Sequence, residues 1–333
     1  MHQAPDSRLF PSAPLFSPPE REANLAALTT ETLDVLVVGG GINGAVAAAA
    51  LAGGGAKVGL VDKGDFAGGV SSSSSNLAWG GIKYLESGDL RLVRKLCMSR
   101  NHLMDAYPST VREIRFFTSI RRGFRLWSVF VWLGALLYWL MGNCRMAMPR
   151  YLSAAKIRRE APVVAPADIV GGLEYSDCYL YDNDSRFVFN FIRSSIDAGG
   201  KACNYTSVEA LGWLTAESCW EARLIDHVSG RSMTVKALSI VNATGPSADA
   251  LNATVGVSTE HHHVLSKGIH LIVDRVTDQN KVLTFFASDG RLFFVIPMGP
   301  KTCIGTTDTP VDSAGVEVTP EDRDFVLANA NQL

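Results

Sequence analysis

The sequence predicts an α/β protein of about two domains. The chain has 333 residues, and at roughly 150 residues per domain this length allows two. A β-branched run at 34–38 precedes a glycine-rich turn, a small-residue helix at 45–52 and a second apolar strand at 57–61. This order forms a βαβ unit. Segments 270–274 and 292–297, with 301–306, alternate as half-buried strands do, and they predict a mixed sheet elsewhere.

Composition excludes several classes of function. Lys and Arg number 31 against 33 Asp and Glu, a formal net charge of −2, so a nucleic-acid partner is not expected. The six cysteines form no CxxC pair, which argues against a zinc site or a disulfide scaffold and favours a reducing compartment. The run His261–His263 is interpreted as a polar loop, because three adjacent histidines cannot all face one ion. No metal is expected.

Residues 1–32 hold five of the 14 prolines and are expected to form a mobile leader, with a short helix at 20–28. They contain no apolar core of a secretory signal, and their acidic residues outnumber their arginines, unlike those of a mitochondrial transit peptide.

The glycine-rich turn matches a dinucleotide fingerprint. Gly39 permits a tight turn, Gly41 lets the backbone approach a pyrophosphate at a helix N-terminus, and Gly44 lets helix and strand pack closely. Asp62 ends the second strand, where a carboxylate can accept hydrogen bonds from ribose hydroxyls. With strand, helix and acid in register, the pattern predicts dinucleotide binding, without distinguishing NAD from FAD.

Two further segments suit the same ligand. The serine run 71–75 precedes Gly80 and Gly81, and the apolar strand 238–241 ends in a small-residue turn at 242–246. Hydroxyls and backbone amides at such places can contact phosphate or a flavin ring. The predicted cofactor-binding residues are Gly39, Gly41, Asn43, Gly44, Asp62, Ser72, Ser73, Ser74, Gly80, Gly81, Thr244 and Gly245.

These motifs resemble the FAD-dependent glycerol-3-phosphate dehydrogenases, within a wider superfamily of flavin amine and hydroxy-acid oxidases. The resemblance extends over nearly all of residues 33–310. The matching stretches are VVGGGINGA (37–45), the serine run, GGIKYLESGDLRLV (80–93), EYSDC (174–178), NDSR (183–186), VNATGP (241–246), KGIH (267–270), FVIP (294–297) and IGTTD (304–308).

The resemblance implies that FAD accepts hydride from carbon 2 of glycerol 3-phosphate, which yields dihydroxyacetone phosphate. Electrons would then pass to a membrane quinone, or to oxygen in the oxidase branch. His270 matches the base for the 2-hydroxyl, and Tyr84 and Thr306 match substrate-site positions. Lys83 stands where the family usually has an arginine, and as a cation it can still contact a phosphate.

Other departures bear on the cofactor and the substrate. The family usually has a lysine at Asn76 and a histidine at Trp79. Neither residue here can form a covalent flavin tether, so non-covalent FAD is expected. The thinner positive charge around the substrate leaves open a flavin enzyme for another small hydroxy or amino acid. A separate alternative is a non-catalytic, truncated FAD-binding fragment.

Residues 126–144 contain no charge, and arginines flank them. Alone, this segment is at the lower limit for a membrane-spanning helix. A single crossing is disfavoured, because segments on both sides should reach one cofactor. A buried or cap helix and a helix in the membrane interface stay open, and the resemblance matches the segment to an apolar stretch near the membrane-facing side.

The expected architecture is an FAD/NAD(P)-binding Rossmann-like domain, formed by 33–107 with 184–206 and 238–255, and an inserted mixed-sheet α+β substrate domain, formed by 108–183 and 256–333. The second domain is expected to be incomplete, because the resemblance implies that family members continue further. A membrane surface is the expected location: the mitochondrial inner membrane in a eukaryote, or the bacterial cytoplasmic membrane. A homodimer is plausible.

Overall fold

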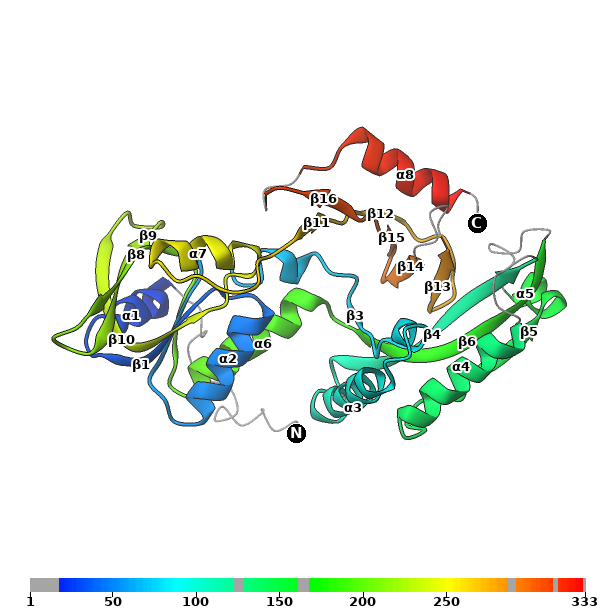
Figure 1. Ribbon diagram of the computed structural model, residues 1–333, viewed down its shortest axis with the longest axis horizontal. Helices are drawn as coiled ribbons and strands as arrows, with labels where there is room; N and C mark the ends of the chain where they lie inside the picture. Colours follow the sequence, from blue (N-terminus) through cyan, green and yellow to red (C-terminus); the bar gives the residue numbers. More distant parts are fainter. Residues whose placement is uncertain (1–17, 123–127, 161–167, 287–291, 314–316, 332–333) are drawn as a thin grey trace, which may run out of the picture. The chain divides into compact units, whose positions relative to one another are not determined.

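The computed structural model describes residues 18–122, 128–160, 168–286, 292–313 and 317–331. The chain divides into two compact units (Figure 1). The first unit comprises Met1–Ser74 and Asn183–His263, and the second comprises Ser75–Asp182 and Val264–Leu333.

The first unit contains a mixed sheet in the order β7-β2-β1-β10-β9-β8. Its parallel half joins β7, β2, β1 and β10, and its antiparallel half joins β10, β9 and β8. The strands are β1 (Leu33–Val38), β2 (Val58–Val61), β7 (Lys201–Cys203), β8 (Thr206–Leu214), β9 (Cys219–Asp226) and β10 (Ser232–Asn242). The predicted βαβ unit is thus confirmed.

Alternate residues of β1 serve the two faces of this sheet. Val37 packs in a cluster with α2 (Ile42–Gly53) and α6 (Asp184–Asp197). Leu36 and Val38 pack in another cluster, with α1 (Pro18–Leu28). Both faces of the parallel strands are therefore covered, as such strands require. The short η2 (Val70–Ser72), η5 (Gly245–Ser247) and α7 (Ala248–Thr254) complete the unit.

The prediction of a mobile leader is wrong for residues 18–32. Leu25 and Leu28 of α1 are buried in the core. Arg21 donates 2.6 Å to the Asp226 carboxylate, whose side chain is fully buried. The apolar face of α1 therefore covers the sheet, which composition alone did not reveal. The expected helix at 20–28 is confirmed, and residues 1–17 lie outside the described residues.

The second unit is built on a larger mixed sheet in the order β12-β15-β14-β13-β4-β6-β3, with β5 also paired to β6. The predicted strands at 270–274, 292–297 and 301–306 are confirmed within a residue. The strands are β3 (Leu77–Ala78), β4 (Val111–Arg121), β5 (Arg150–Ser153), β6 (Ile169–Leu180), β12 (His270–Asp274), β13 (Lys281–Phe286), β14 (Leu292–Met298) and β15 (Lys301–Gly305). A separate pair joins β11 (Leu265–Lys267) and β16 (Thr309–Val311).

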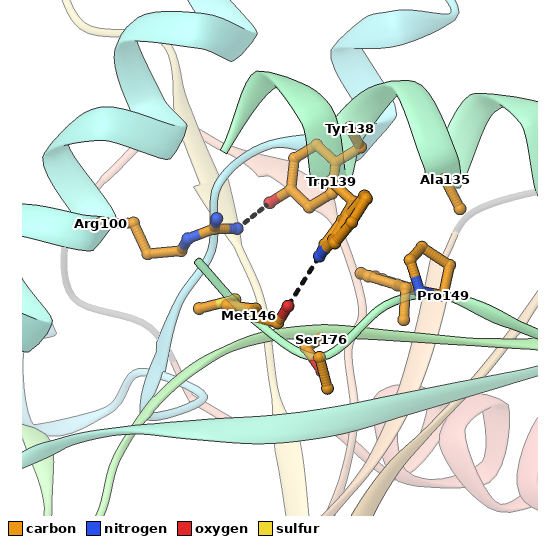
Figure 2. Close-up of a pocket in the computed structure, with 9 residues that line it drawn as sticks. Arg100, Ala135, Tyr138, Trp139, Met146, Pro149 and Ser176 are labelled. Atoms are coloured by element: carbon orange, nitrogen blue, oxygen red, sulfur yellow. Dashed lines mark hydrogen bonds between the residues drawn. The ribbon is translucent and has the colours of Figure 1, made fainter. Parts of the chain in front are cut away.

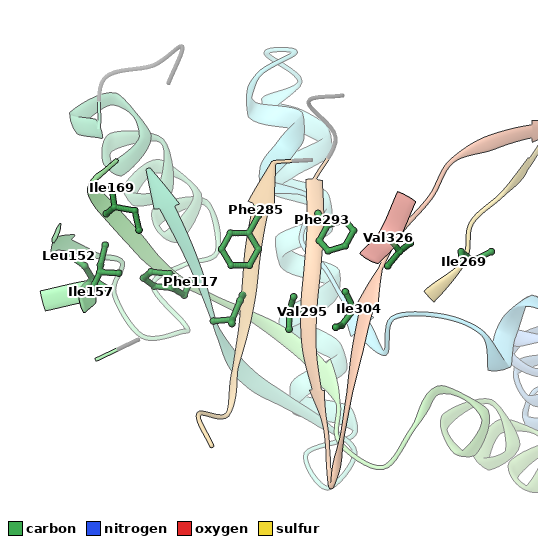
Figure 3. Close-up of a cluster of buried hydrophobic side chains, with 11 residues drawn as sticks. Phe117, Leu152, Ile157, Ile169, Ile269, Phe285, Phe293, Val295, Ile304 and Val326 are labelled. Carbon is green, nitrogen blue, oxygen red and sulfur yellow. The ribbon is translucent and has the colours of Figure 1, made fainter. Parts of the chain in front are cut away.

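Helices pack on both faces of this sheet. Phe116 of β4 packs in a cluster with α3 (Leu90–Ala106) and α4 (Ser128–Met141). Its neighbour Phe117 faces the other way, in a cluster with α5 (Ala154–Glu160) and α8 (Pro320–Ala330). Figure 3 shows Phe117, Phe285 and Phe293 in this second cluster, on neighbouring strands. The short η3 (Ile82–Leu85) precedes α3.

The unit boundaries differ from the expected domains over residues 75–107 and 207–237, and Asn183 and residues 256–263 also lie in the first unit and not in the second. Residues 75–107 belong to the second unit, because β3 pairs with β6 and because Val93 and Cys97 of α3 are buried in its core. Residues 207–237 belong to the first unit, because β8 and β9 extend its sheet from β10.

The apolar segment forms α4, and its residues 126–127 lie outside the described residues. In the described part of the chain, no helix is long and apolar enough to cross a membrane. Ala135 and Tyr138 are buried, whereas Val129 and Phe130 are exposed. The helix therefore packs by one face only.

Candidate functional site

The glycine turn after β1 brings three backbone segments very close together. The Gly39 amide donates 2.8 Å to the Val61 carbonyl, and Gly39 has a φ of +107°. A Cβ there would lie 2.4 Å from the Ala243 carbonyl oxygen, and a Cβ at Gly44 would lie 1.8 Å from the Gly39 carbonyl oxygen. Only glycine fits at these two positions, so the turn keeps the N-terminus of α2 close against the end of β1.

Asp62 lies where the fingerprint predicts, after the end of β2. Its carboxylate accepts hydrogen bonds from the amides of Gly40 at 2.6 Å and Gly64 at 2.8 Å. It therefore ties the glycine turn to the loop that follows β2. A carboxylate has about four acceptor positions, so these two bonds leave capacity for ribose hydroxyls.

The serine run contributes a residue that the sequence prediction missed. The Ser71 hydroxyl accepts 3.0 Å from the Ile42 amide in the first turn of α2, where a pyrophosphate would be bound. The predicted Ser72, Ser73 and Ser74 are exposed, and the Ser74 amide donates 2.9 Å to Asp184. The sequence offered no means of choosing among five adjacent serines.

The turn after β10 meets the glycine turn. The Ala243 amide donates 2.8 Å to the Val38 carbonyl, so the carboxyl ends of β1 and β10 lie side by side. The Thr244 hydroxyl donates 2.7 Å to the Asn242 side chain, and Gly245 has a φ of +58°. Thr244 and Gly245 thus lie at the same sheet edge as Gly39, Gly41 and Asp62, and the exposed Asn43 lies in the first turn of α2.

Gly80 and Gly81 belong to the second unit, whereas the other predicted cofactor-binding residues belong to the first. The Gly80 amide donates to both carboxylate oxygens of Asp177 at 3.1 Å. It is therefore committed to an interaction within that unit. The cofactor role of Gly80 and Gly81 stays a prediction.

Asp177 is the centre of a buried network. It accepts 2.6 Å from the Tyr138 hydroxyl and 3.1 Å from Arg100, which also pairs with it as an ion. Burial raises the pKa of Tyr138 well above its ordinary range, so its phenol remains a donor. Neither Arg100 nor Tyr138 belongs to a motif that could have predicted the network.

A small pocket adjoins this network under α4 (Figure 2). Arg100 and Tyr138 form part of its wall, and Trp139 donates 2.7 Å to the Met146 carbonyl at its side. Ser176 of β6 and Pro149 also line it. The pocket therefore belongs to the packing between α4 and the sheet.

The predicted substrate residues all lie in the second unit. His270 begins β12 and pairs in register with Gly305 of β15, which immediately precedes Thr306. The structure thus brings His270 and Thr306 to neighbouring strand ends. Burial lowers the pKa of His270 from its ordinary value of 6.5, so its imidazole is neutral near pH 7. Lys83 and Tyr84 lie on η3 and are exposed.

The described residues contain no group of three or more His, Cys, Asp and Glu side chains that could hold a metal ion. His263 instead pairs with Asp249, with its Nδ1 at 3.1 Å from the carboxylate.

Comparison with known proteins identifies the family. The model of the family described as "FAD dependent oxidoreductase" matches residues 34–333. The chain belongs to this family. The FAD/NAD(P)-binding Rossmann-like α/β fold and the resemblance found in the sequence are both confirmed, and FAD is the cofactor of this family.

Within this FAD-dependent oxidoreductase family, the chain is similar to proteins named glycerol-3-phosphate dehydrogenase. The chain is 31% identical over 322 residues to the aerobic glycerol-3-phosphate dehydrogenase of Bacillus subtilis. This match covers 96% of this chain and 58% of that protein. It is 29% identical to the mitochondrial glycerol-3-phosphate dehydrogenase of Bos taurus, over 93% of this chain and 44% of that protein. The chain thus spans about half the length of the curated relatives it matches.

A solved structure agrees with this. The glycerol-3-phosphate dehydrogenase of Bacillus halodurans, solved in complex with FAD, matches with a TM-score of 0.74 and 27% identity. The match covers 94% of this chain and 55% of that one.

Proposed function

We propose that this chain is the FAD-binding and substrate-oxidising part of an enzyme that converts sn-glycerol 3-phosphate to dihydroxyacetone phosphate and passes the electrons to a quinone. The observation that carries the proposal is the match of 96% of the chain to a protein named aerobic glycerol-3-phosphate dehydrogenase. The glycine turn and Asp62, described above, support it from the structure. The relatives named for this activity are longer than this chain. Oxidation of glycerol 3-phosphate therefore has to be measured on this chain itself.

The first unit supplies a fitting cradle for the cofactor. A bound flavin would supply a hydride acceptor. The close approach at Gly39 and Gly44 leaves the α2 N-terminus open to a pyrophosphate, whose charge the helix dipole and amides would meet. Ser71 would add its hydroxyl there, and Asp62 would accept from the ribose.

FAD is proposed to be bound without a covalent bond. Asn76 is buried, its carbonyl accepts 2.8 Å from the Leu180 amide, and it has no nucleophile. Trp79 offers an indole in place of the histidine that a tether would need. Precipitating the holoprotein with acid should therefore leave the flavin in the supernatant, and a yellow pellet would contradict this.

His270 is proposed as the base. Oxidation of an alcohol by hydride transfer forms a carbonyl only if the hydroxyl proton also leaves. Burial lowers the pKa of His270, so its imidazole is neutral near pH 7 and can accept this proton. Lys83 would provide a positive charge for the substrate phosphate, and Tyr84 and Thr306 would contact the substrate.

A quinone is dissolved in the lipid bilayer, so an enzyme that reduces it has to work at a membrane surface. The proposed locations are the mitochondrial inner membrane in a eukaryote and the cytoplasmic membrane in a bacterium. A homodimer also stays a prediction, which light scattering of the purified chain would test.

Another substrate is the main competing function. Asn76 and Trp79 stand where the resemblance implies a lysine and a histidine. This reduces the positive charge available to a phosphate and favours a small hydroxy or amino acid. Turnover of glycerol 3-phosphate measured beside 2-hydroxy acids and amino acids decides between them. Turnover of one of the latter alone would overturn the proposal. A purified chain that takes up no added FAD would instead indicate a non-catalytic fragment.

A further inference from the structure

The antiparallel ladder that carries His270 is interrupted directly before that residue. On one side of the interruption, β11 pairs with β16 as far as Lys267 and Thr309. On the other side, β12 pairs with β15 from His270 and Gly305 onward. Between these pairs, two residues of one segment oppose three of the other, and the three include Thr306. An extra residue of this kind makes a β-bulge, which redirects the side chains beside it.

The Thr307 side chain bridges the interruption. Thr307 is buried, with 5% of its surface exposed. Its hydroxyl accepts 3.0 Å from the Ile269 amide and donates 3.4 Å to the Lys267 carbonyl. A buried backbone amide requires a hydrogen-bond partner. Because Ile269 lies between the two ladders, a side chain here supplies the partner that a regular ladder would take from the backbone.

Thr307 also contacts Thr306, the other predicted substrate residue of this segment. The Thr306 hydroxyl donates 2.9 Å to the Thr307 carbonyl. The His270 imidazole lies against β15, since a Cβ added at Gly305 would lie 2.8 Å from its Cδ2. A change in the spacing between Ile269 and Thr307 would therefore move the imidazole relative to Thr306.

The segment before His270 is held from its other side by α8. Lys267 donates to the Asp322 carboxylate, and these two side chains are 10% and 8% exposed. Ile269 packs in one cluster with Val326 of α8 (Figure 3). Since α8 fixes this side, the hydroxyl of Thr307 is the contact that sets the distance to the opposite strand.

We propose that Thr307 is a positioning residue, whose hydroxyl holds the His270 imidazole and the Thr306 side chain in the arrangement that oxidation of the substrate requires. Thr307 acts through these two residues and is assigned no contact with the substrate. The inference rests on the proposed function for the role of His270. A displacement of about 1 Å near a reacting group costs about 10²-fold in rate, so one hydrogen bond at this place affects the reaction.

Two buried threonines of the same sheet allow a matched test. Thr307→Val removes the hydroxyl with little change in shape, and Thr307→Ser keeps it. The control is Thr302→Val on β15. Thr302 is 2% exposed, and its hydroxyl also accepts from a backbone amide, that of Val276 at 3.2 Å. Both valine variants lose the same kind of hydrogen bond, so both should lower the midpoint of urea unfolding.

The two valine variants should differ in turnover. Thr307→Val should lower kcat for glycerol 3-phosphate by about 10- to 100-fold, whereas Thr307→Ser and Thr302→Val should retain the wild-type kcat. An unchanged kcat in Thr307→Val, an equal loss in Thr302→Val, or a serine variant that does not recover activity would overturn the inference. If Thr307→Val does not fold, Thr307→Ala takes its place with the same expected result.

A second measurement reads the position of His270 without turnover. In the full FAD-loaded chain with isotope-labelled histidine, the Cδ2–H resonance of His270 is identified by its absence from His270→Ala. We expect this resonance to shift in Thr307→Val and to stay in place in Thr307→Ser and Thr302→Val. An unshifted resonance in Thr307→Val would overturn the inference. A wild type that does not oxidise glycerol 3-phosphate, with the shift present in Thr307→Val, would instead overturn the proposed function.

Discussion

The Tyr138 hydroxyl of α4 donates a hydrogen bond of 2.6 Å to the Asp177 carboxylate of β6, and the same carboxylate accepts from the Gly80 amide. One buried side chain thereby fixes both α4 and the turn that precedes Lys83 and Tyr84. Lys83 and Tyr84, which are proposed to contact the substrate, lie on η3 directly after this turn. The network therefore fixes the position at which η3 starts.

Tyr138→Phe should destabilise the chain by about 2 kcal/mol, because a hydrogen bond to a buried charged group is lost. Urea denaturation followed by circular dichroism measures this. If the network positions the Gly80 turn, the KM for glycerol 3-phosphate should rise more than kcat falls. An unchanged midpoint of unfolding would show that the hydroxyl is not needed to satisfy Asp177.

Gly44→Ala should abolish binding of FAD, because its Cβ would lie 1.8 Å from the Gly39 carbonyl oxygen. The backbone cannot yield there without moving α2 from β1, at a cost of about 3 kcal/mol or more. Flavin absorbance after reconstitution measures the loss. Gly53→Ala is the matched control on the same helix, since nothing lies within 4 Å of its added Cβ. Equal flavin content in the two variants would contradict the proposal that the turn containing Gly39 and Gly44 binds FAD.

His270→Ala should lower kcat by roughly 10²–10⁴-fold while leaving the flavin spectrum intact, as expected for loss of a general base. Steady-state turnover with an artificial electron acceptor measures this. Ile272→Ala on the same strand is the control, because its side chain is 56% exposed and has no proposed role. Unchanged turnover in His270→Ala would show that His270 is not the base.

The pH profile follows from the same residue. His270 accepts a proton only when neutral, and burial lowers its pKa below the ordinary value of 6.5. The acid limb of kcat/KM should therefore lie below pH 6.5 and be absent from the residual activity of His270→Ala. An acid limb above 6.5, or one that persists in the variant, contradicts this assignment.

Arg21→Ala should destabilise the first unit by about 3 kcal/mol, because it leaves the buried Asp226 carboxylate without its cation. Burial raises the pKa of Asp226, but hydrogen bonds from Arg21, Ser229 and the Val228 amide outweigh it and lower this pKa below its ordinary 3.8. The stability from Asp226 is thus present above pH 3.8 and is lost as the pH falls toward the lowered pKa.

Urea denaturation near neutral pH and in acid measures this difference. The control is Arg231→Ala, which breaks an exposed pair with Glu22 and should cost less than about 1 kcal/mol. Equal losses in the two variants would show that the Arg21–Asp226 pair adds nothing beyond a surface pair.

The sequence predicted those parts of the fold and site that depend on local backbone rules. The glycines of the turn, Asp62 and the strand at 270–274 are determined by tight turns, strand ends and alternation, which neighbouring residues reveal. By contrast, Ser71 was missed because five serines look alike until one reaches the α2 N-terminus.

Long-range packing accounts for the other differences. Arg21 meets Asp226 across 205 positions, and Arg100 meets Asp177 across 77. No spacing rule connects such pairs. For the same reason, the leader prediction failed at α1, and residues 75–107 were assigned to the wrong unit: each packs on strands that are distant in sequence.

Anaerobic addition of glycerol 3-phosphate to the FAD-loaded chain tests the central claim most directly. The account predicts that the visible absorbance of oxidised flavin disappears with glycerol 3-phosphate and persists with glycerol, which lacks the phosphate. Flavin that stays oxidised with glycerol 3-phosphate, in a chain shown to hold FAD, would contradict it.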